Sequence, residues 1–138
     1  MSVKQVSVFM ENREGRLSKV MKTLADEQIN VASLSMAETE DYGVLRLIVS
    51  KPERALEVLK EHEISAKLTN VVAVKISNEI GSFNQLLKPL ENLNIEYLYV
   101  LSTKSYVSMI LKIADVVTAE KQLTDAGYEL LSEEEAYK

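Results

Sequence analysis

An internal repeat is the feature that most constrains how this chain can fold. Alternating apolar residues, the pattern of a half-buried strand, occupy residues 6–10 and recur at residues 72–76. Each strand is followed by four apolar positions with the spacing of one helix face, at Leu17, Val20, Met21 and Leu24 and again at Phe83, Leu86, Leu87 and Leu90. Because all four positions recur at one offset, the sequence predicts two copies of one small module.

The rest of each copy predicts a hairpin, a second helix and a last strand. The hairpin strands are rich in β-branched and aromatic residues and span 31–36 and 44–49 in the first copy and 97–102 and 107–112 in the second. A helix follows at 53–61 and 116–125, and a strand at 64–68 and 128–131. The predicted fold class is therefore α+β, with two tandem βαββαβ modules in residues 1–69 and 70–138.

The small size of each module and its sheet edge predict how the sheets are completed. A module of this size buries only a small core, and its second strand forms an edge with unpaired backbone groups. We therefore expect the two antiparallel sheets to join edge to edge into eight strands, with the helices on one face. Such an edge can also pair with a second copy of the chain, in a homodimer.

Proline and aspartate residues predict where three helices begin or break. Pro52 suits the first turn of a helix, and Asp115 suits the N-cap, where its carboxylate accepts backbone N–H groups. Pro89 lies inside the helix expected over 83–93, where it lacks an N–H and crowds the carbonyl of Gln85. We therefore expect a kink or a break at Pro89.

Residue types that most enzymes and metal sites need are scarce. The sequence has no Cys and a single His, His62, so it offers no disulfide, thiol nucleophile or His pair. We therefore expect no catalytic site, no metal and no cofactor. No apolar run approaches the roughly 20 residues that span a bilayer, and the first residues lead straight into a strand pattern. We expect a cytoplasmic protein that does not enter a membrane.

The charge balance argues against nucleic-acid binding. The formal net charge is −5, and neither half of the chain is basic. Residues 1–70 carry ten basic and eleven acidic side chains, and residues 71–138 carry six and ten. Nucleic-acid binding depends on clustered Lys and Arg that neutralise phosphates. We therefore expect no nucleic-acid partner.

A polar turn with a glycine joins the first strand to the first helix in both copies. It reads Glu11-Asn12-Arg13-Glu14-Gly15-Arg16-Leu17 in the first copy and Ser77-Asn78-Glu79-Ile80-Gly81-Ser82-Phe83 in the second. Gly adopts backbone dihedrals that other residues avoid, and N–H groups at a helix start attract a carboxylate. The Asn amide both donates and accepts, as an amino-acid head group requires. Asn can equally stabilise the turn itself, so a structural role stays open.

The first turn, together with Gln28-Ile29-Asn30-Val31, resembles the Asn/Asp-Arg-Pro-Gly-x-Leu and Gly-Ile/Val-Asn-Ile signature of ACT domains. The resemblance covers both repeats. This tandem arrangement is similar to that of stand-alone tandem ACT proteins of bacteria. It implies ferredoxin-like modules and a non-catalytic sensor of a free amino acid or similar small carboxylate, held at the interface between modules. We expect no catalytic domain in this chain, so a regulated enzyme would be a separate protein acted on in trans.

The resemblance also implies which residues contact the ligand. Asn12 and Asn30 would contact its head group, the N–H groups of Arg16 and Leu17 would hold its carboxylate, and Met10 and Val31 would line the pocket. Further candidates at the two turns are Glu11, Arg13, Glu14 and Gly15 in the first copy and Asn78, Ile80, Gly81, Ser82 and Phe83 in the second. Glu14 and Ile80 replace the family's Pro, and Glu96 replaces the Asn of the second strand. We therefore expect the first copy to carry the better site.

Two other functions stay open at the level of sequence. A structural or protein-binding domain would use the sheet edge and leave the pocket empty. A small isomerase or mutase would use the Arg and Glu side chains that cluster at the first turn, Glu11, Arg13, Glu14 and Arg16.

Overall fold

The computed structural model describes residues 3–11, 13–38, 42–102 and 106–137. The chain divides into two compact units, one made mainly of Lys4–Thr69 and the other mainly of Asn70–Ala136. We refer to them as the first and the second module. Each is described by itself below.

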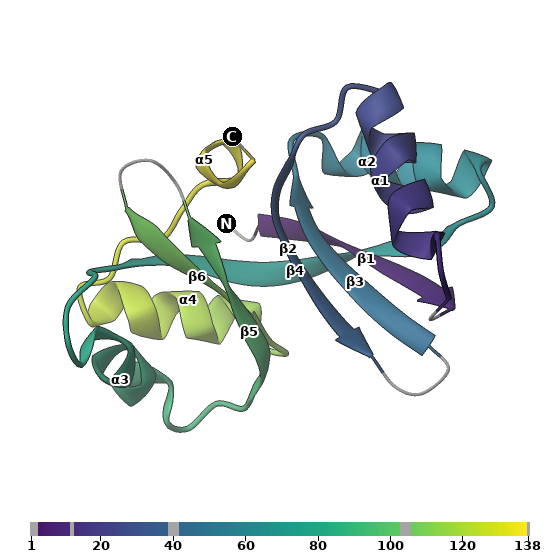
Figure 1. Cartoon of the computed structure of the whole chain (residues 1–138). Helices are drawn as coiled ribbons and strands as arrows, with labels where there is room; N and C mark the ends of the chain where they lie inside the picture. The colour runs from purple at the N-terminus through teal and green to yellow at the C-terminus, as the bar shows by residue number, and fades with distance from the viewer. Residues whose placement is uncertain (1–2, 12, 39–41, 103–105, 138) are drawn as a thin grey trace. The chain divides into compact units, whose positions relative to one another are not determined.

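The first module contains the βαββα elements that the repeat predicted, followed by the beginning of a long strand (Figure 1). The elements are β1 (Val3–Glu11), α1 (Arg16–Asp26), β2 (Val31–Glu38), β3 (Tyr42–Val49), α2 (Pro52–Glu61) and the first part of β4 (Ser65–Ile76). The strand β3 pairs antiparallel with both β1 and β2, so Val8 lies opposite Leu45 and Leu34 opposite Leu47. The resulting order is β2-β3-β1-β4.

The second module repeats this arrangement with a shorter first helix. Its elements are the second part of β4, α3 (Ser82–Leu87), the 3₁₀ helix η1 (Lys88–Leu90), β5 (Ile95–Ser102), β6 (Val107–Ile113), α4 (Val116–Asp125) and α5 (Glu133–Ala136). The strand β6 pairs antiparallel with β4 and β5. Both modules therefore use one strand topology.

The expected α+β fold of tandem modules is confirmed, but the expected number of strands is wrong. The described residues form six strands, in the order β2-β3-β1-β4-β6-β5, instead of eight. No Gly or Pro separates residues 64–68 from residues 72–76, so the two expected strands merge into β4. Residues 128–131 contribute only a bridge between Leu130 and Val74. The second strands, β2 and β5, each have one neighbour in the strand order, and β4 is the strand that continues between the modules.

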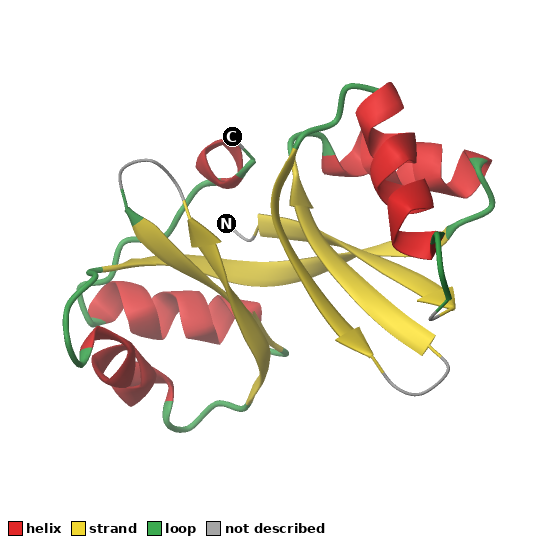
Figure 2. Cartoon of the chain, viewed as in Figure 1, coloured by secondary structure: helices red, strands yellow, loops and turns green. Residues whose placement is uncertain are grey.

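The apolar positions that define the repeat form the core of each module. In the first module the helices lie on one face of the sheet (Figure 2), and the buried cluster joins β1, α1, β3 and α2. Its members include Val8, Leu24, Leu47 and Leu59, all fully buried. The equivalent cluster of the second module includes Val74, Leu90, Leu111 and Leu123. Burial of these faces removes apolar surface from water, which stabilises each module.

The two helix starts and the helix break that the sequence predicts lie at the expected residues. Pro52 occupies the first turn of α2, and the Asp115 carboxylate caps α4 by accepting the Thr118 N–H at 3.1 Å. The helix α3 ends at Leu87 and continues as η1 around Pro89, so the expected break is confirmed. The Pro89 carbonyl accepts a 2.6 Å hydrogen bond from the Gln122 side chain.

Candidate functional site

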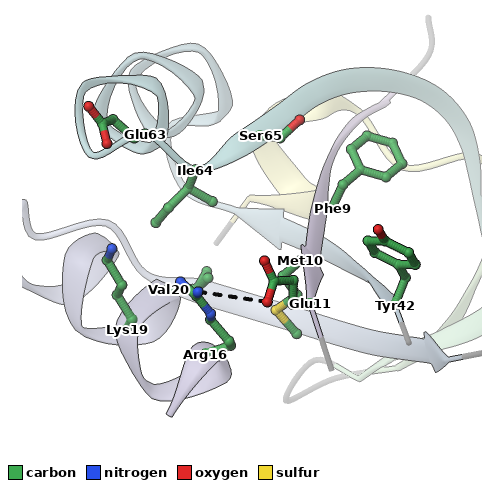
Figure 3. Close-up of a pocket in the computed structure, with 10 residues that line it drawn as sticks. All are labelled: Phe9, Met10, Glu11, Arg16, Lys19, Val20, Tyr42, Glu63, Ile64 and Ser65. Carbon is green, nitrogen blue, oxygen red and sulfur yellow. Dashed lines mark ion pairs between the residues drawn. The ribbon is translucent and has the colours of Figure 1, made fainter. Parts of the chain in front are cut away.

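A pocket of about 420 Å³ lies within the first module, at the end of β1 beside α1 (Figure 3). Four segments contribute to it: the end of β1, the first turns of α1, the start of β3, and the link from α2 into β4. The lining residues are Phe9, Met10, Glu11, Arg16, Lys19, Val20, Tyr42, Glu63, Ile64 and Ser65. Because β4 follows β1 in the strand order, the chain brings residues 9–11 and 63–65 together.

Two cationic and two anionic side chains line this pocket. Arg16 and Lys19 are three residues apart on α1, so they share one side of the helix. Glu11 ends β1, and Glu63 lies just after α2. The Glu11 carboxylate lies 3.2 Å from Arg13 Nε and 4.0 Å from Arg16 Nη2. The ion pair with Arg16 is therefore the weaker of the two.

Apart from Ser65 and the Tyr42 hydroxyl, the remaining lining is apolar. Met10 and Val20 are buried, and Ile64 is half-buried against the same core. In Figure 3, Phe9 and Tyr42 lie to one side of Met10 and Glu11, and Lys19 and Glu63 lie to the other. A pocket with an apolar floor and both charges at its margin can accept a small zwitterion with an apolar side chain.

The turn between β1 and α1 takes the backbone conformation expected of its glycine. Gly15 has φ +81°, in the left-handed region that L side chains avoid, and no side chain caps α1. The Arg16 N–H donates to the Arg13 carbonyl at 3.3 Å, and the Lys19 N–H donates to Gly15 at 3.0 Å. Of the two N–H groups expected to hold a carboxylate, that of Arg16 is therefore already engaged within the turn.

Comparison with known proteins decides the family. The family model of the ACT domain pair matches residues 1–134. The chain belongs to the ACT domain pair family.

Two individual relatives each cover most of the chain. The solved structure of protein BT0572 from Bacteroides thetaiotaomicron is 33% identical, with a TM-score of 0.94 over 100% of this chain and 97% of that chain. The acetolactate synthase small subunit of Buchnera aphidicola subsp. Baizongia pistaciae (strain Bp) is 24% identical over 121 residues, which are 76% of this chain and 74% of that protein.

Two more distant solved structures share the fold. One is the regulatory subunit of aspartate kinase from Thermus thermophilus, 18% identical with a TM-score of 0.62 over 90% of this chain and 91% of that chain. The other is E. coli aspartokinase III in complex with lysine and aspartate, 18% identical with a TM-score of 0.54 over 90% of this chain and 31% of that chain.

Three of the expected ligand residues of the first ACT module meet in the pocket, and the other candidates among the described residues do not line it. Met10, Glu11 and Arg16 are lining residues, and Arg13 reaches the site through its ion pair with Glu11. The candidates that are exposed outside the pocket are Glu14, Gly15 and Leu17. Asn12 lies outside the described residues.

The second-strand candidates occupy a separate place in the first ACT module. The Asn30 N–H donates to the Ser50 hydroxyl at 3.0 Å, and the Asn30 carbonyl accepts the Ser50 N–H at 2.9 Å. Asn30 is exposed and Val31 is half-buried, and neither lines the pocket. The backbone of Asn30 therefore joins the start of β2 to the end of β3.

The turn of the second ACT module repeats the glycine conformation but not the charges. Gly81 has φ +84°, and Ser82 Oγ lies 2.7 Å from Ser77 Oγ and accepts the Glu79 N–H at 3.3 Å. Asn78, Ile80 and Phe83 are exposed. The Ser82 hydroxyl thus bonds within the turn.

The sequence interpretation missed seven lining residues of the ACT pocket. They are Phe9, Lys19, Val20, Tyr42, Glu63, Ile64 and Ser65. The predicted βαββαβ order already placed the fourth strand beside the first, which could have located residues 63–65. The charge of Lys19, one turn after Arg16, was the other available signal.

The described ranges contain neither a cluster of metal-binding side chains nor a helix that could span a membrane. No group of three or more His, Asp or Glu side chains is arranged there to hold a metal ion. No helix in those ranges is long and apolar enough to span a bilayer.

Proposed function

We propose that this ACT domain pair is a non-catalytic, cytoplasmic regulatory protein that binds a free amino acid and acts on a separate enzyme. The observation that carries the proposal is the pocket of the first module, where Arg16 and Glu11 offer opposite charges beside an apolar floor. Family membership and the similarity to a small subunit of acetolactate synthase support the regulatory role. In this proposal the two modules span residues 1–69 and 70–138. The proposed function requires no cofactor.

The pocket can bind each part of an α-amino acid by ordinary chemistry. The ligand carboxylate would pair with Arg16 and Lys19, and its ammonium group with Glu11 and Glu63. Hydrogen bonds between charged groups are stronger than neutral ones. The side chains of Arg16 and Glu11 are 36% and 51% exposed, so solvent weakens each pair, and burial of the ligand side chain must add to the affinity.

Differential scanning fluorimetry against the twenty amino acids tests this function. Ligand at a hundred times its dissociation constant stabilises the folded chain by roughly 2.7 kcal/mol, which raises the melting temperature. For L-leucine, matched controls are 4-methylpentanoate, which lacks the amine, and 3-methylbutylamine, which lacks the carboxylate. We expect a shift with one or more amino acids and a smaller shift with either half-ligand. No shift with any amino acid would overturn the proposal.

A second candidate function, pairing with another copy of the chain, is favoured by the edge strand β2. Leu34 and Met36 lie opposite the core residues Leu47 and Leu45, yet they are 53% and 39% exposed. No charged residue interrupts Val31–Ala37, although charges commonly protect an open edge. We propose that a second copy pairs along β2 in a homodimer.

Light scattering coupled to gel filtration tests the homodimer. Leu34→Lys should yield monomers at concentrations where the wild-type chain is dimeric. Each subunit would then place a lysine ammonium group on β2, and pairing of the two strands would bring like charges together. Val117→Lys on α4 is a matched control, since Val117 is 77% exposed. A wild-type chain that stays monomeric at every concentration would exclude this pairing.

A further inference from the structure

The edge strand β2 carries the most exposed methionine of the described residues. The sequence has five methionines, and the described ranges include Met10, Met21, Met36 and Met109. Met10 and Met109 are buried, and Met21 is half-buried against the core of the first module. Met36 is 39% exposed. An oxidant in solution therefore reaches the Met36 side chain more readily than the other three.

The Met36 side chain lies at the open edge of the sheet, beside Gly43. Its Cε atom lies 3.1 Å from the position that a Cβ on Gly43 would take, so the missing side chain of Gly43 leaves room for it. Met36 lies opposite the core residue Leu45, and β2 has β3 as its one neighbour in the strand order. The thioether is therefore on the core-facing side of the sheet, where no further strand covers it in this chain.

The equivalent edge position of the second module is apolar and exposed but contains no sulfur. Val100 on β5 lies opposite the core residue Met109, as Met36 lies opposite Leu45. Val100 is 51% exposed. The same fold thus accommodates valine at this place, which makes Met36→Val a replacement that removes the thioether and keeps an apolar, β-branched edge.

In the proposed homodimer, Met36 would contribute to the apolar contact between the two copies. Leu34 and Met36 lie at equal distances from Ser35 along β2. Antiparallel pairing of two β2 strands about Ser35 therefore sets Leu34 of one copy opposite Met36 of the other. Both side chains are exposed in the single chain, so this pairing removes apolar surface from water.

Conversion of Met36 to its sulfoxide would oppose this contact. Hydrogen peroxide transfers one oxygen atom to the thioether sulfur: an S–O bond forms, the O–O bond breaks, and the second oxygen leaves as water with both protons. The sulfur loses two electrons and the peroxide gains them. The sulfoxide oxygen is a polar acceptor, and its burial opposite the apolar Leu34 side chain costs free energy.

We propose that Met36 is a peroxide-sensitive site whose oxidation dissociates the homodimer. This inference rests on the proposed pairing along β2 and adds its regulation. Pairing covers Met36 and protects it from peroxide, whereas the sulfoxide weakens pairing. Methionine sulfoxide reductases return the sulfoxide to the thioether, so the change is reversible.

Light scattering coupled to gel filtration, before and after peroxide treatment, tests this inference, with peptide mapping by mass spectrometry to locate the sulfoxide. We expect Met36 to be oxidised before Met10, Met21 and Met109, and the dissociation constant of the dimer to rise at least about tenfold. Met36→Val should remain dimeric after the same treatment. Met36→Gln, which places a permanent polar group on the edge, should weaken the dimer without peroxide.

The rate of Met36 oxidation provides a second readout. Measured against free methionine in the same solution, this rate should fall as the protein concentration rises through the dissociation constant of the dimer. A rate that is independent of concentration would contradict the burial of Met36 between the two copies.

The outcomes separate this inference from the homodimer itself. A wild-type dimer that persists with Met36 fully oxidised would overturn the inference while the homodimer stands. So would a Met36→Val chain that dissociates in peroxide, or a Met36 side chain that stays reduced while Met10 or Met109 is oxidised. A wild-type chain that is monomeric at every concentration would overturn both.

Discussion

Gly15 and Gly81, 66 residues apart, adopt nearly the same left-handed backbone conformation, with φ +81° and φ +84°. Each precedes the first residue of a helix, Arg16 in α1 and Ser82 in α3. The repeat therefore extends from the apolar pattern to the backbone geometry of the turn. The side chains placed around this geometry differ, since Arg16 follows the first glycine and Ser82 the second.

Replacement of these two glycines by Ala should destabilise each module by a similar amount. A Cβ at either position would meet no atom within 4 Å, so the cost is the left-handed backbone alone, about 1 kcal/mol. Asn tolerates this conformation better, so Gly81→Asn should cost less than Gly81→Ala. Urea unfolding measures these differences. A loss of several kcal/mol in Gly81→Ala would indicate a steric clash that the structure lacks.

Two buried serines should respond differently to removal of their hydroxyls. Ser7 Oγ accepts from Gln5 Nε2 at 2.9 Å and lies 2.9 Å from Thr69 Oγ1, whereas Ser108 Oγ has no hydrogen-bond partner among the described residues. Ser7→Ala should cost roughly 1–3 kcal/mol, because it removes a partner from buried polar groups. Ser108→Ala should be neutral or stabilising. Equal losses in urea unfolding would contradict this assignment.

The N-cap of α4 should make part of the stability depend on pH. Hydrogen bonds from the Thr118 side chain and backbone hold the pKa of the Asp115 carboxyl below its ordinary value. A lowered folded-state pKa contributes stability above the unfolded-state pKa, and this contribution disappears as the pH falls through the folded value. Asp115→Ala should therefore lower the melting temperature at pH 7, and its difference from the wild type should shrink below about pH 4. A difference that stays constant down to pH 2 would exclude this linkage.

The sequence determined the elements of the fold better than their joining. The helix faces and hairpin strands follow from local periodicity, and the break at Pro89 follows from its missing N–H. The continuity of β4 was not predictable from periodicity, because residues 64–68 and 72–76 each have a strand pattern. Whether Thr69, Asn70 and Val71 form a turn or continue the strand depends on contacts with other strands.

The candidate site was predicted in part, for a similar reason. The first turn supplied Met10, Glu11 and Arg16, which are adjacent to it in sequence. Glu63 and Ile64 enter the same pocket through the strand order, which sequence spacing does not display. Asn30 was expected to contact the ligand. Its backbone instead forms hydrogen bonds with Ser50, where the start of β2 lies beside the end of β3.

The most direct test of amino-acid binding in the first module is calorimetric titration of four chains with the tightest-binding amino acid. They are the wild type, Glu11→Gln, Arg16→Gln and the control Lys22→Gln, whose side chain is exposed on α1 and paired with Asp26. We predict that Glu11→Gln and Arg16→Gln each weaken binding at least about tenfold, equivalent to ~1.4 kcal/mol, and that Lys22→Gln binds as the wild type does. Equal affinity in all four chains would contradict a ligand held by these opposite charges.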